Sequence, residues 1–138
     1  MADTRNRLKT VLVVDDDGDM RFMLRILLER GGYQVTEAGD GQAALLSIKA
    51  NMPDLVVTDM RMPRMDGGEL IEKLRSDEGT ARLPIILVTA YAVLPVTSEL
   101  ADATIPKPFA PERVVSTVTN LLGGRRATDR QAAEKERD

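Results

Sequence analysis

The sequence predicts an α/β fold in which a parallel sheet carries helices on both faces. Two observations support this class. Short runs rich in Val, Ile and Leu alternate along the chain with longer segments whose apolar residues recur at helical spacing. Several of the short runs also end on a charged or hydroxyl side chain. Strands that alternate with helices form parallel sheets buried on both faces, and their carboxyl ends share one edge.

The first unit is a strand followed by a helix. Residues 1–8 form a lead-in, and Val11–Val14 is the first apolar run. Met and Leu side chains at helical spacing predict a helix over Asp19–Arg30. Asp17 is a suitable N-cap, and the glycine pair Gly31-Gly32 ends the helix.

The next two units repeat this order. A strand is predicted at Gln34–Ala38, and a helix at Gln42–Ala50 with Asp40 as its cap. The β-branched run Leu55–Asp59 predicts a buried strand. Leu and Ile at helical spacing then predict a helix over Gly67–Arg75.

The last part of the chain contains two more strands and a final helix. The strands are expected at Ile85–Val88 and Thr104–Pro106, the latter at a sheet edge because a central strand does not tolerate proline. The final helix starts at Pro111, a favourable first-turn residue. Pro95 lies where a fourth helix would form, so we expect that helix to be short or irregular, displaced or absent.

Composition limits the possible functions. A length of 138 residues with 43% apolar residues suits one domain, which we place at 9–122, followed by a polar tail at 123–138 that its composition predicts to be disordered. The absence of cysteine excludes disulfides, and the absence of histidine excludes a phosphohistidine within the chain. A net charge of −3 argues against nucleic-acid binding, and no apolar run is long enough for membrane insertion. Since no signal peptide is evident either, we expect a cytoplasmic protein.

Acidic side chains follow two of the predicted strands. Asp59 closes the third strand, and Asp15, Asp16, Asp17 and Asp19 follow the first. Carboxylates this close repel one another unless a cation is present, and such hard oxygen ligands suit Mg²⁺. The alternatives are a solvated Asp59 at the start of a loop and acidic residues that only cap the next helix. Capping needs one aspartate, whereas this loop offers several.

Two further strand ends carry a hydroxyl and a cation. Thr89 follows Ile85–Val88, and Lys107 follows Thr104–Pro106. Taken singly, the threonine suits a strand and the lysine is expected to be solvated. Together with the carboxylates, they provide a nucleophile, a metal pocket, a hydroxyl donor and an ammonium group. Phosphoryl transfer requires this set, because its demands are mainly positioning and charge stabilisation.

Four segments occur in order along the chain: VLVVDDD at 11–17, DLVVTDMRMPRMDG at 54–67, IILVTA at 85–90 and KPF at 107–109. In these segments the chain resembles the CheY-like receiver domains of two-component response regulators, over Val11–Leu122. The resemblance implies a five-stranded sheet of order 2-1-3-4-5. It also implies a role in phosphorelay signal transduction as a stand-alone response regulator.

The resemblance assigns roles to the acidic residues. Asp59 corresponds to the phosphoacceptor. Asp15 and Asp16 correspond to the acidic pair that binds Mg²⁺ together with Asp59, and Asp16 is the more direct ligand. The backbone carbonyl of Arg61 corresponds to the remaining protein ligand of the metal.

The remaining catalytic roles fall on Thr89 and Lys107. Thr89 matches the hydroxyl that turns toward the phosphoryl group, and Lys107 matches the lysine that pairs with it. The bond between Lys107 and Pro108 is often cis in the family, and an X–Pro bond permits this. The implied phosphoryl donor is a phosphohistidine on a sensor histidine kinase or a histidine phosphotransfer protein. Phosphorylation would change a docking surface for a downstream protein that the sequence does not identify.

Three features depart from the family pattern. The segment between Thr89 and Lys107 is short, so the surface near the fourth helix should differ. Thr104 occupies a position where the family often has an aromatic residue, so no aromatic side chain can report phosphorylation there. Arg61 and Tyr91 are bulky at the two positions that flank the attacking water in the family. We therefore expect a protein that catalyses its own phosphorylation and slow dephosphorylation, and not a turnover enzyme.

Two other functional classes share part of this pattern. A phosphatase of the haloacid dehalogenase type also begins with an apolar strand and a D-x-D pair, here Asp15 and Asp17. It would need a much longer chain and a late acidic strand end, and neither is present. The other class is a phosphorylation-independent interaction module on the same fold, which the altered fourth-helix region favours and the complete set of site residues opposes.

Overall fold

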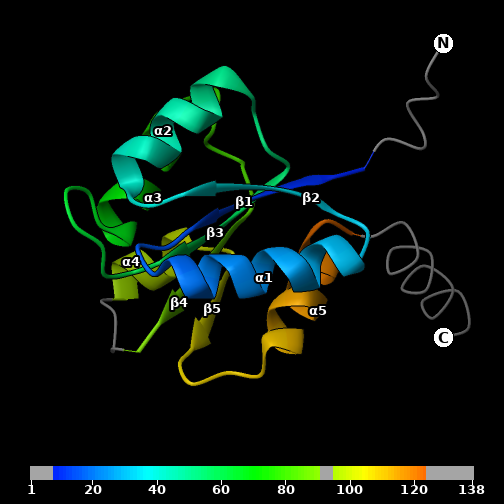
Figure 1. The fold of residues 1–138 in the computed structure, drawn as a ribbon. Helices are drawn as coiled ribbons and strands as arrows, with labels where there is room; N and C mark the ends of the chain where they lie inside the picture. Colours follow the sequence, from blue (N-terminus) through cyan, green and yellow to red (C-terminus); the bar gives the residue numbers. More distant parts are fainter. Residues whose placement is uncertain (1–7, 91–94, 124–138) are drawn as a thin grey trace, which may run out of the picture.

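The structure is a computed structural model that describes residues 8–90 and 95–123 (Figure 1). Strands and helices alternate along the described chain. The strands are β1 (Thr10–Val14), β2 (Gln34–Ala38), β3 (Leu55–Asp59), β4 (Ile85–Thr89) and β5 (Ala103–Pro106). The helices are α1 (Gly18–Arg30), α2 (Gly41–Ala50), α3 (Gly67–Ser76), α4 (Pro95–Leu100) and α5 (Pro111–Leu121).

The strands form one parallel sheet of order β2-β1-β3-β4-β5, which confirms the order implied by the family resemblance. β2 and β5 are the two edges. Pro106 therefore lies in an edge strand, where it pairs with Thr89 of β4. An edge position is where a proline can be accommodated in a sheet.

Alternate side chains of each strand enter two separate apolar cores. In β1, Val11 and Val13 pack with α1 and α5, whereas Leu12 and Val14 pack with α2 and α3. Figure 1 shows α1 and α5 on one side of the sheet and α2 and α3 on the other. The helix residues buried on the α1 and α5 face are Leu24, Leu28, Val114 and Val118, and those on the α2 and α3 face are Ala44, Ile48, Leu70, Ile71 and Leu74.

Three aspartates begin helices. Asp17 accepts hydrogen bonds from backbone N–H groups in the first turn of α1, and Asp40 accepts one from Ala43 in α2, as predicted. Asp66 caps α3 in a reciprocal capping box with Glu69. These caps place the start of each helix directly after a strand-end loop.

α4 is a helix of six residues that starts at Pro95, which confirms the prediction of a short fourth helix. Its C-terminal end is held by Arg75, whose Nε donates to the carbonyl of Leu100 at 2.9 Å. The Arg75 guanidinium also pairs with Asp102 at 2.9 Å, and Asp102 accepts the N–H of Ile85 at 2.8 Å. These contacts connect the end of α4 to α3 and to the start of β4.

Within residues 8–90 and 95–123, no helix is both long enough and apolar enough to cross a bilayer. The predictions made for Tyr91, for the lead-in before Leu8 and for the tail after Gly123 lie outside the described residues.

Candidate functional site

The predicted site residues come from the carboxyl ends of four strands. Asp15 directly follows β1, Asp59 and Thr89 are the last residues of β3 and β4, and Lys107 directly follows β5. The parallel sheet brings these ends to one edge. The parallel arrangement of the strands therefore brings together side chains that are far apart in the sequence.

The acidic side chains form a compact cluster. One carboxylate oxygen from each of Asp15, Asp16 and Asp59 lies within 4.8 Å of the others. Asp15 is buried, Asp59 is half-buried and Asp16 is exposed. The cluster thus has a buried floor and an open side through which a small ion could enter.

The pKa of the Asp15 carboxyl is raised from 3.8 to about 6, mainly by burial and also by the neighbouring carboxylates of Asp59 and Asp16. Two interactions act in the opposite direction. The N–H of Asp17 donates to Asp15 Oδ1 at 2.9 Å, and Lys107 contributes its positive charge. The cluster is therefore electrostatically costly when all three carboxylates are ionised.

A divalent cation would relieve this repulsion. Hard carboxylate oxygens with one exposed side match the preference of Mg²⁺, which keeps several waters and takes one or two carboxylates. The residues present therefore fit the metal that the sequence predicts. Arg61, expected to offer its backbone carbonyl, lies exposed in the loop two residues after Asp59.

Lys107 contacts Asp59 directly. Its Nζ lies 3.3 Å from Asp59 Oδ1, and the same oxygen accepts the N–H of Met60 at 2.9 Å. The backbone N–H of Lys107 donates to the carbonyl of Thr89 at 2.8 Å. The peptide bond between Lys107 and Pro108 is cis, the isomer that the sequence permits. A cation is thus already placed beside the predicted phosphoacceptor.

The two threonines occupy different environments. Thr89 is buried at the end of β4, between β3 and β5. Thr104 is half-buried in β5 and pairs with Leu87 of β4. Thr89 therefore lies at the carboxyl end of its strand, where the site residues gather, whereas Thr104 lies within β5 before its carboxyl end.

The loop after Asp59 turns back closely on itself. Met60 donates to the carbonyl of Val88 at 3.1 Å, and Gly67 donates to the carbonyl of Met60 at 2.8 Å. A Cβ atom at Gly67 would overlap the carbonyl oxygen of Asp59. The start of α3 can therefore approach the backbone of Asp59 only because residue 67 is glycine.

The far side of this loop is attached to the start of α2. Arg64 has a φ of 66°, and its guanidinium pairs with Asp40 at 2.7 Å. The N–H of Gly41 donates to the carbonyl of Met65 at 3.0 Å. The N–H of Ala43 and the Arg64 guanidinium lower the pKa of the Asp40 carboxyl. Asp40 was predicted as a helix cap, but its contact with Arg64 was not predicted from the sequence.

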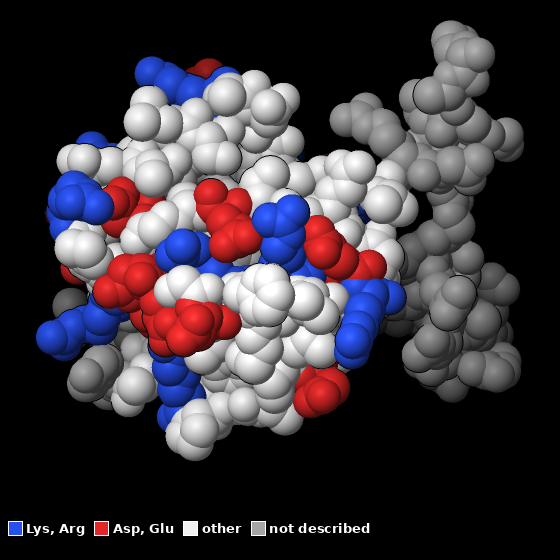
Figure 2. Space-filling model, viewed as in Figure 1, with Lys and Arg blue, Asp and Glu red and all other residues white. Residues whose placement is uncertain are grey.

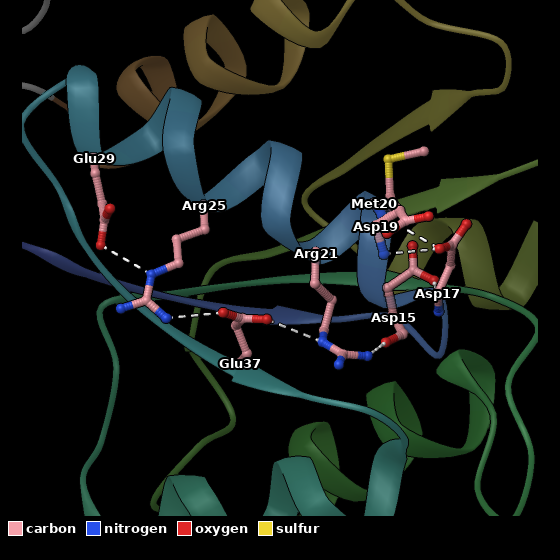
Figure 3. A network of polar contacts seen from close by, with 8 residues as sticks. All are labelled: Asp15, Asp17, Asp19, Met20, Arg21, Arg25, Glu29 and Glu37. Carbon is pink, nitrogen blue, oxygen red and sulfur yellow. Dashed lines mark hydrogen bonds and ion pairs between the residues drawn. The ribbon is translucent and has the colours of Figure 1, made fainter.

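A network of ion pairs borders the acidic cluster on the β2 side (Figure 3). Arg21 of α1 donates from Nη1 to the carbonyl of Asp15 at 2.6 Å and from Nε to Glu37 at 3.1 Å. Arg25 binds the other oxygen of Glu37 at 2.9 Å and Glu29 at 3.1 Å. Hydrogen bonds from Arg25 and Arg21 lower the pKa of Glu37.

The same face is visible as a surface in Figure 2. Acidic side chains gather over the N-terminal end of α1, and basic and acidic side chains alternate along the rest of the face formed by α1 and β2. The contact between Arg21 and Glu37 was not predicted from the sequence. Their spacing along the chain carries no signal, because the contact depends on how α1 packs across β2.

Comparison with known families gives a match over most of the chain. The family model described as the response regulator receiver domain matches residues 11–119.

Several curated proteins are similar in sequence. The response regulator MprA of Mycobacterium ulcerans is 41% identical over 128 residues, which cover 90% of this chain and 54% of MprA. The phosphate regulon transcriptional regulatory protein PhoB of Pseudomonas aeruginosa is 36% identical over 118 residues, covering 83% and 52%. Hybrid signal transduction histidine kinase D of Dictyostelium discoideum is 40% identical over 121 residues, covering 85% and 8%. The chain therefore spans about half the length of the two regulators and a small part of the kinase.

Solved structures share the fold. A CheY-like receiver domain protein of Methanospirillum hungatei has a TM-score of 0.79 at 32% identity, covering 88% of this chain and 99% of that one. The response regulator TrrA of Thermotoga maritima, in complex with Mg²⁺ and BeF, has a TM-score of 0.76 at 32% identity, covering 83% and 99%.

Proposed function

Because the chain belongs to the response regulator receiver domain family, we propose that it is a phosphoacceptor switch in a two-component or phosphorelay pathway. In this proposal Asp59 receives a phosphoryl group from a phosphohistidine on a sensor histidine kinase or a histidine phosphotransfer protein. The chain has no histidine, so the donor histidine lies outside these 138 residues. The phosphorylated form would then dock on a downstream protein, in the cytoplasm and without a nucleic-acid contact of this domain.

The observation that carries the proposal is the convergence of Lys107 and the acidic cluster on Asp59. A carboxylate oxygen of Asp59 attacks the phosphorus of the donor. The new O–P bond forms as the P–N bond breaks, and the imidazole of the donor leaves with the electron pair. Asp59 then carries an acyl phosphate. Lys107 is placed to pair with the added negative charge, because its ammonium already lies beside Asp59 Oδ1.

Asp15, Asp16 and Asp59 would hold Mg²⁺, with the backbone carbonyl of Arg61 as a further ligand. When bound, the metal supplies positive charge against the phosphoryl oxygens and against the acidic cluster. The residues themselves orient the nucleophile. The N–H of Met60 holds one oxygen of Asp59, and the half-buried position of Asp59 limits the approach of water.

Phosphorylation can change the conformation only if the new bonds supply enough free energy to shift the equilibrium between the resting and switched states. Hydrogen bonds to charged groups contribute roughly 1.5–3 kcal/mol each. Bonds from Thr89 and Lys107 to a phosphoryl group would together contribute about 3–6 kcal/mol. Moving an equilibrium from 1:99 to 99:1 takes about 5.5 kcal/mol. Two such bonds are therefore just sufficient to reverse a modest bias of the resting state.

The test is labelling with radioactive acetyl phosphate in the presence of Mg²⁺. We expect the wild type to be labelled, Asp59→Asn to lose the label, and chelation of Mg²⁺ to suppress labelling. Asp77→Asn is a matched control, because Asp77 is an exposed aspartate at the opposite end of α3 and should leave labelling unchanged. Equal labelling of wild type and Asp59→Asn would refute the proposal.

Two further measurements separate the alternatives. Partner binding that is the same with and without beryllofluoride would favour a phosphorylation-independent docking module, a reading to which the short α4 lends support. Release of phosphate over many turnovers of a small phosphoester would favour a phosphatase. The bulky Arg61 predicts slow loss of the phosphoryl group, so a half-life of only seconds would contradict that part of the proposal.

A further inference from the structure

Arg21 connects the acidic loop to the edge strand of the sheet. Its side chain is 25% exposed and lies between the loop after β1 and β2 (Figure 3). Nη1 donates to the backbone carbonyl of Asp15 at 2.6 Å, and Nε donates to Glu37 at 3.1 Å. The guanidinium therefore contacts the backbone of the acidic loop, and its anchor lies on a different element.

The contacted carbonyl belongs to the peptide unit that joins Asp15 to Asp16. A peptide unit is planar, so its carbonyl oxygen and the Cα atoms of both residues move as one rigid group. A hydrogen bond at this oxygen restricts the orientation of the whole unit. Asp15 and Asp16 are two of the three clustered carboxylates, so this restriction limits the directions in which both side chains can point.

β2 holds both peptide units of Asp15. The N–H of Asp15 donates to the carbonyl of Ala38 at 3.1 Å, and the carbonyl of Asp15 is held through Arg21 by Glu37. Glu37 is held by its place opposite Val13 in the parallel pairing of β1 and β2. The acidic loop is therefore fastened to a strand that contributes no carboxylate to the cluster.

We propose that Arg21 is a positioning residue for the metal site, and that its contact with the Asp15 carbonyl increases the affinity of the acidic cluster for Mg²⁺. This inference rests on the proposed function, because it assumes that the cluster binds Mg²⁺. Partners of this kind around a metal site typically account for a factor of about 10–100 in metal affinity.

The charge of Arg21 allows positioning to be separated from electrostatics. A guanidinium near an acidic pocket repels a divalent cation, so removing its charge should by itself tighten Mg²⁺ binding. Removing the positioning contact should weaken binding. The two effects have opposite signs, and the direction of the change in Kd identifies the larger one.

The experiment measures the Kd for Mg²⁺ by isothermal titration calorimetry on the full chain. We expect Arg21→Gln to bind about tenfold more weakly than the wild type. Arg21→Lys keeps the charge but lacks the planar fork that reaches Glu37 and the carbonyl together, so it should also bind more weakly. Arg25→Gln is the matched control: it removes an arginine from the same Glu37 without touching the acidic loop, and should change Kd by less than about twofold.

Thermal unfolding without Mg²⁺ verifies that each variant is folded, and the metal-induced rise in Tm gives a second measure of affinity. Unchanged or tighter Mg²⁺ binding by Arg21→Gln would overturn the inference while leaving the proposed function intact. Equal weakening by Arg25→Gln would also overturn it, because the effect would then come from the general stability of the ion-pair network. If the wild type itself failed to bind Mg²⁺, both the inference and the proposed metal site would be wrong.

Discussion

The ammonium of Lys107 lies 3.3 Å from Asp59 Oδ1, and this ion pair joins the ends of β5 and β3 across the intervening strand β4. Lys107 is also tied to β4 itself, through its N–H bond to the carbonyl of Thr89. A positive charge is therefore held at the place where phosphorylation of Asp59 would add negative charge.

Lys107→Ala should slow phosphorylation. The variant loses a charge-assisted contact to the transferring group, which contributes roughly 1.5–3 kcal/mol, so labelling by acetyl phosphate should be at least about tenfold slower. The measurement is the initial rate of label incorporation at saturating Mg²⁺. Lys73→Ala, an exposed lysine on α3, serves as the control and should label at the wild-type rate. Equal rates for wild type and Lys107→Ala would contradict the assigned role.

Thr89→Ala should permit labelling but weaken the response to it. The hydroxyl is not needed for attack by Asp59, but its bond to the phosphoryl group would stabilise the switched state. Loss of one such bond should reduce the switching equilibrium about tenfold or more. The measurement is the set of backbone amide NMR shifts that beryllofluoride and Mg²⁺ induce outside the site. Thr89→Ser retains the hydroxyl and should behave as the wild type, and an undiminished response in Thr89→Ala would refute the assignment.

Asp15 should make the Mg²⁺-free protein less stable as pH rises. The pKa of its carboxyl is about 6 in the folded chain against an ordinary value of 3.8, so the folded state binds the proton more tightly than the unfolded state. The contribution of this group is then fully present below 3.8 and is lost as pH rises through about 6. One pKa unit corresponds to about 1.4 kcal/mol, so the loss is on the order of 3 kcal/mol.

The variant Asp15→Asn tests this sign. In EDTA at pH 7.5 its free energy of unfolding in urea should exceed that of the wild type by up to about 3 kcal/mol, and the difference should shrink toward pH 4. Added Mg²⁺ should stabilise the wild type strongly and the variant weakly. A difference between the two proteins that stays constant from pH 4 to pH 7.5 would show that the Asp15 pKa is ordinary.

Gly67→Ala should disturb the site from the backbone. A Cβ there would overlap the carbonyl oxygen of Asp59, so the loop or α3 must shift, at a cost of about 1–3 kcal/mol in the free energy of unfolding. Labelling of Asp59 should slow as well. Gly79→Ala is the control, because its Cβ would meet Asp77 at an ordinary 3.6 Å and should leave both properties close to wild type.

Much of the architecture follows from the order of residues along the chain. The apolar periodicities predict where strands and helices lie, and parallel strands share an edge, so the meeting of Asp15, Asp59, Thr89 and Lys107 was predictable in outline. The proline at residue 95 correctly predicted a short α4, since the helix begins there. The strand order was available only through the family resemblance, because periodicity does not specify which strands are neighbours.

The missed contacts depend on three-dimensional packing. Arg21 reaches Glu37 only because the register of β1 and β2 sets Glu37 opposite Val13, beneath α1. Arg64 meets Asp40 from a loop in which its backbone adopts a φ of 66°, a conformation that an arginine in the sequence does not predict. Contacts between long charged side chains on different elements leave no periodic pattern, so the sequence offered no means to predict them.

The alternation of side chains across the sheet has a consequence for how information leaves the site. In β3, Val57 faces the α1 and α5 core, so Asp59, two residues later, projects over the same side. In β4, Leu87 faces the opposite core, and Thr89 accordingly belongs with the side of α2, α3 and α4. Movement of the Thr89 hydroxyl toward a phosphorylated Asp59 would therefore take it from the α2 and α3 side of the sheet to the α1 and α5 side. Such a movement would change the packing on the side of the sheet that carries α2, α3 and α4.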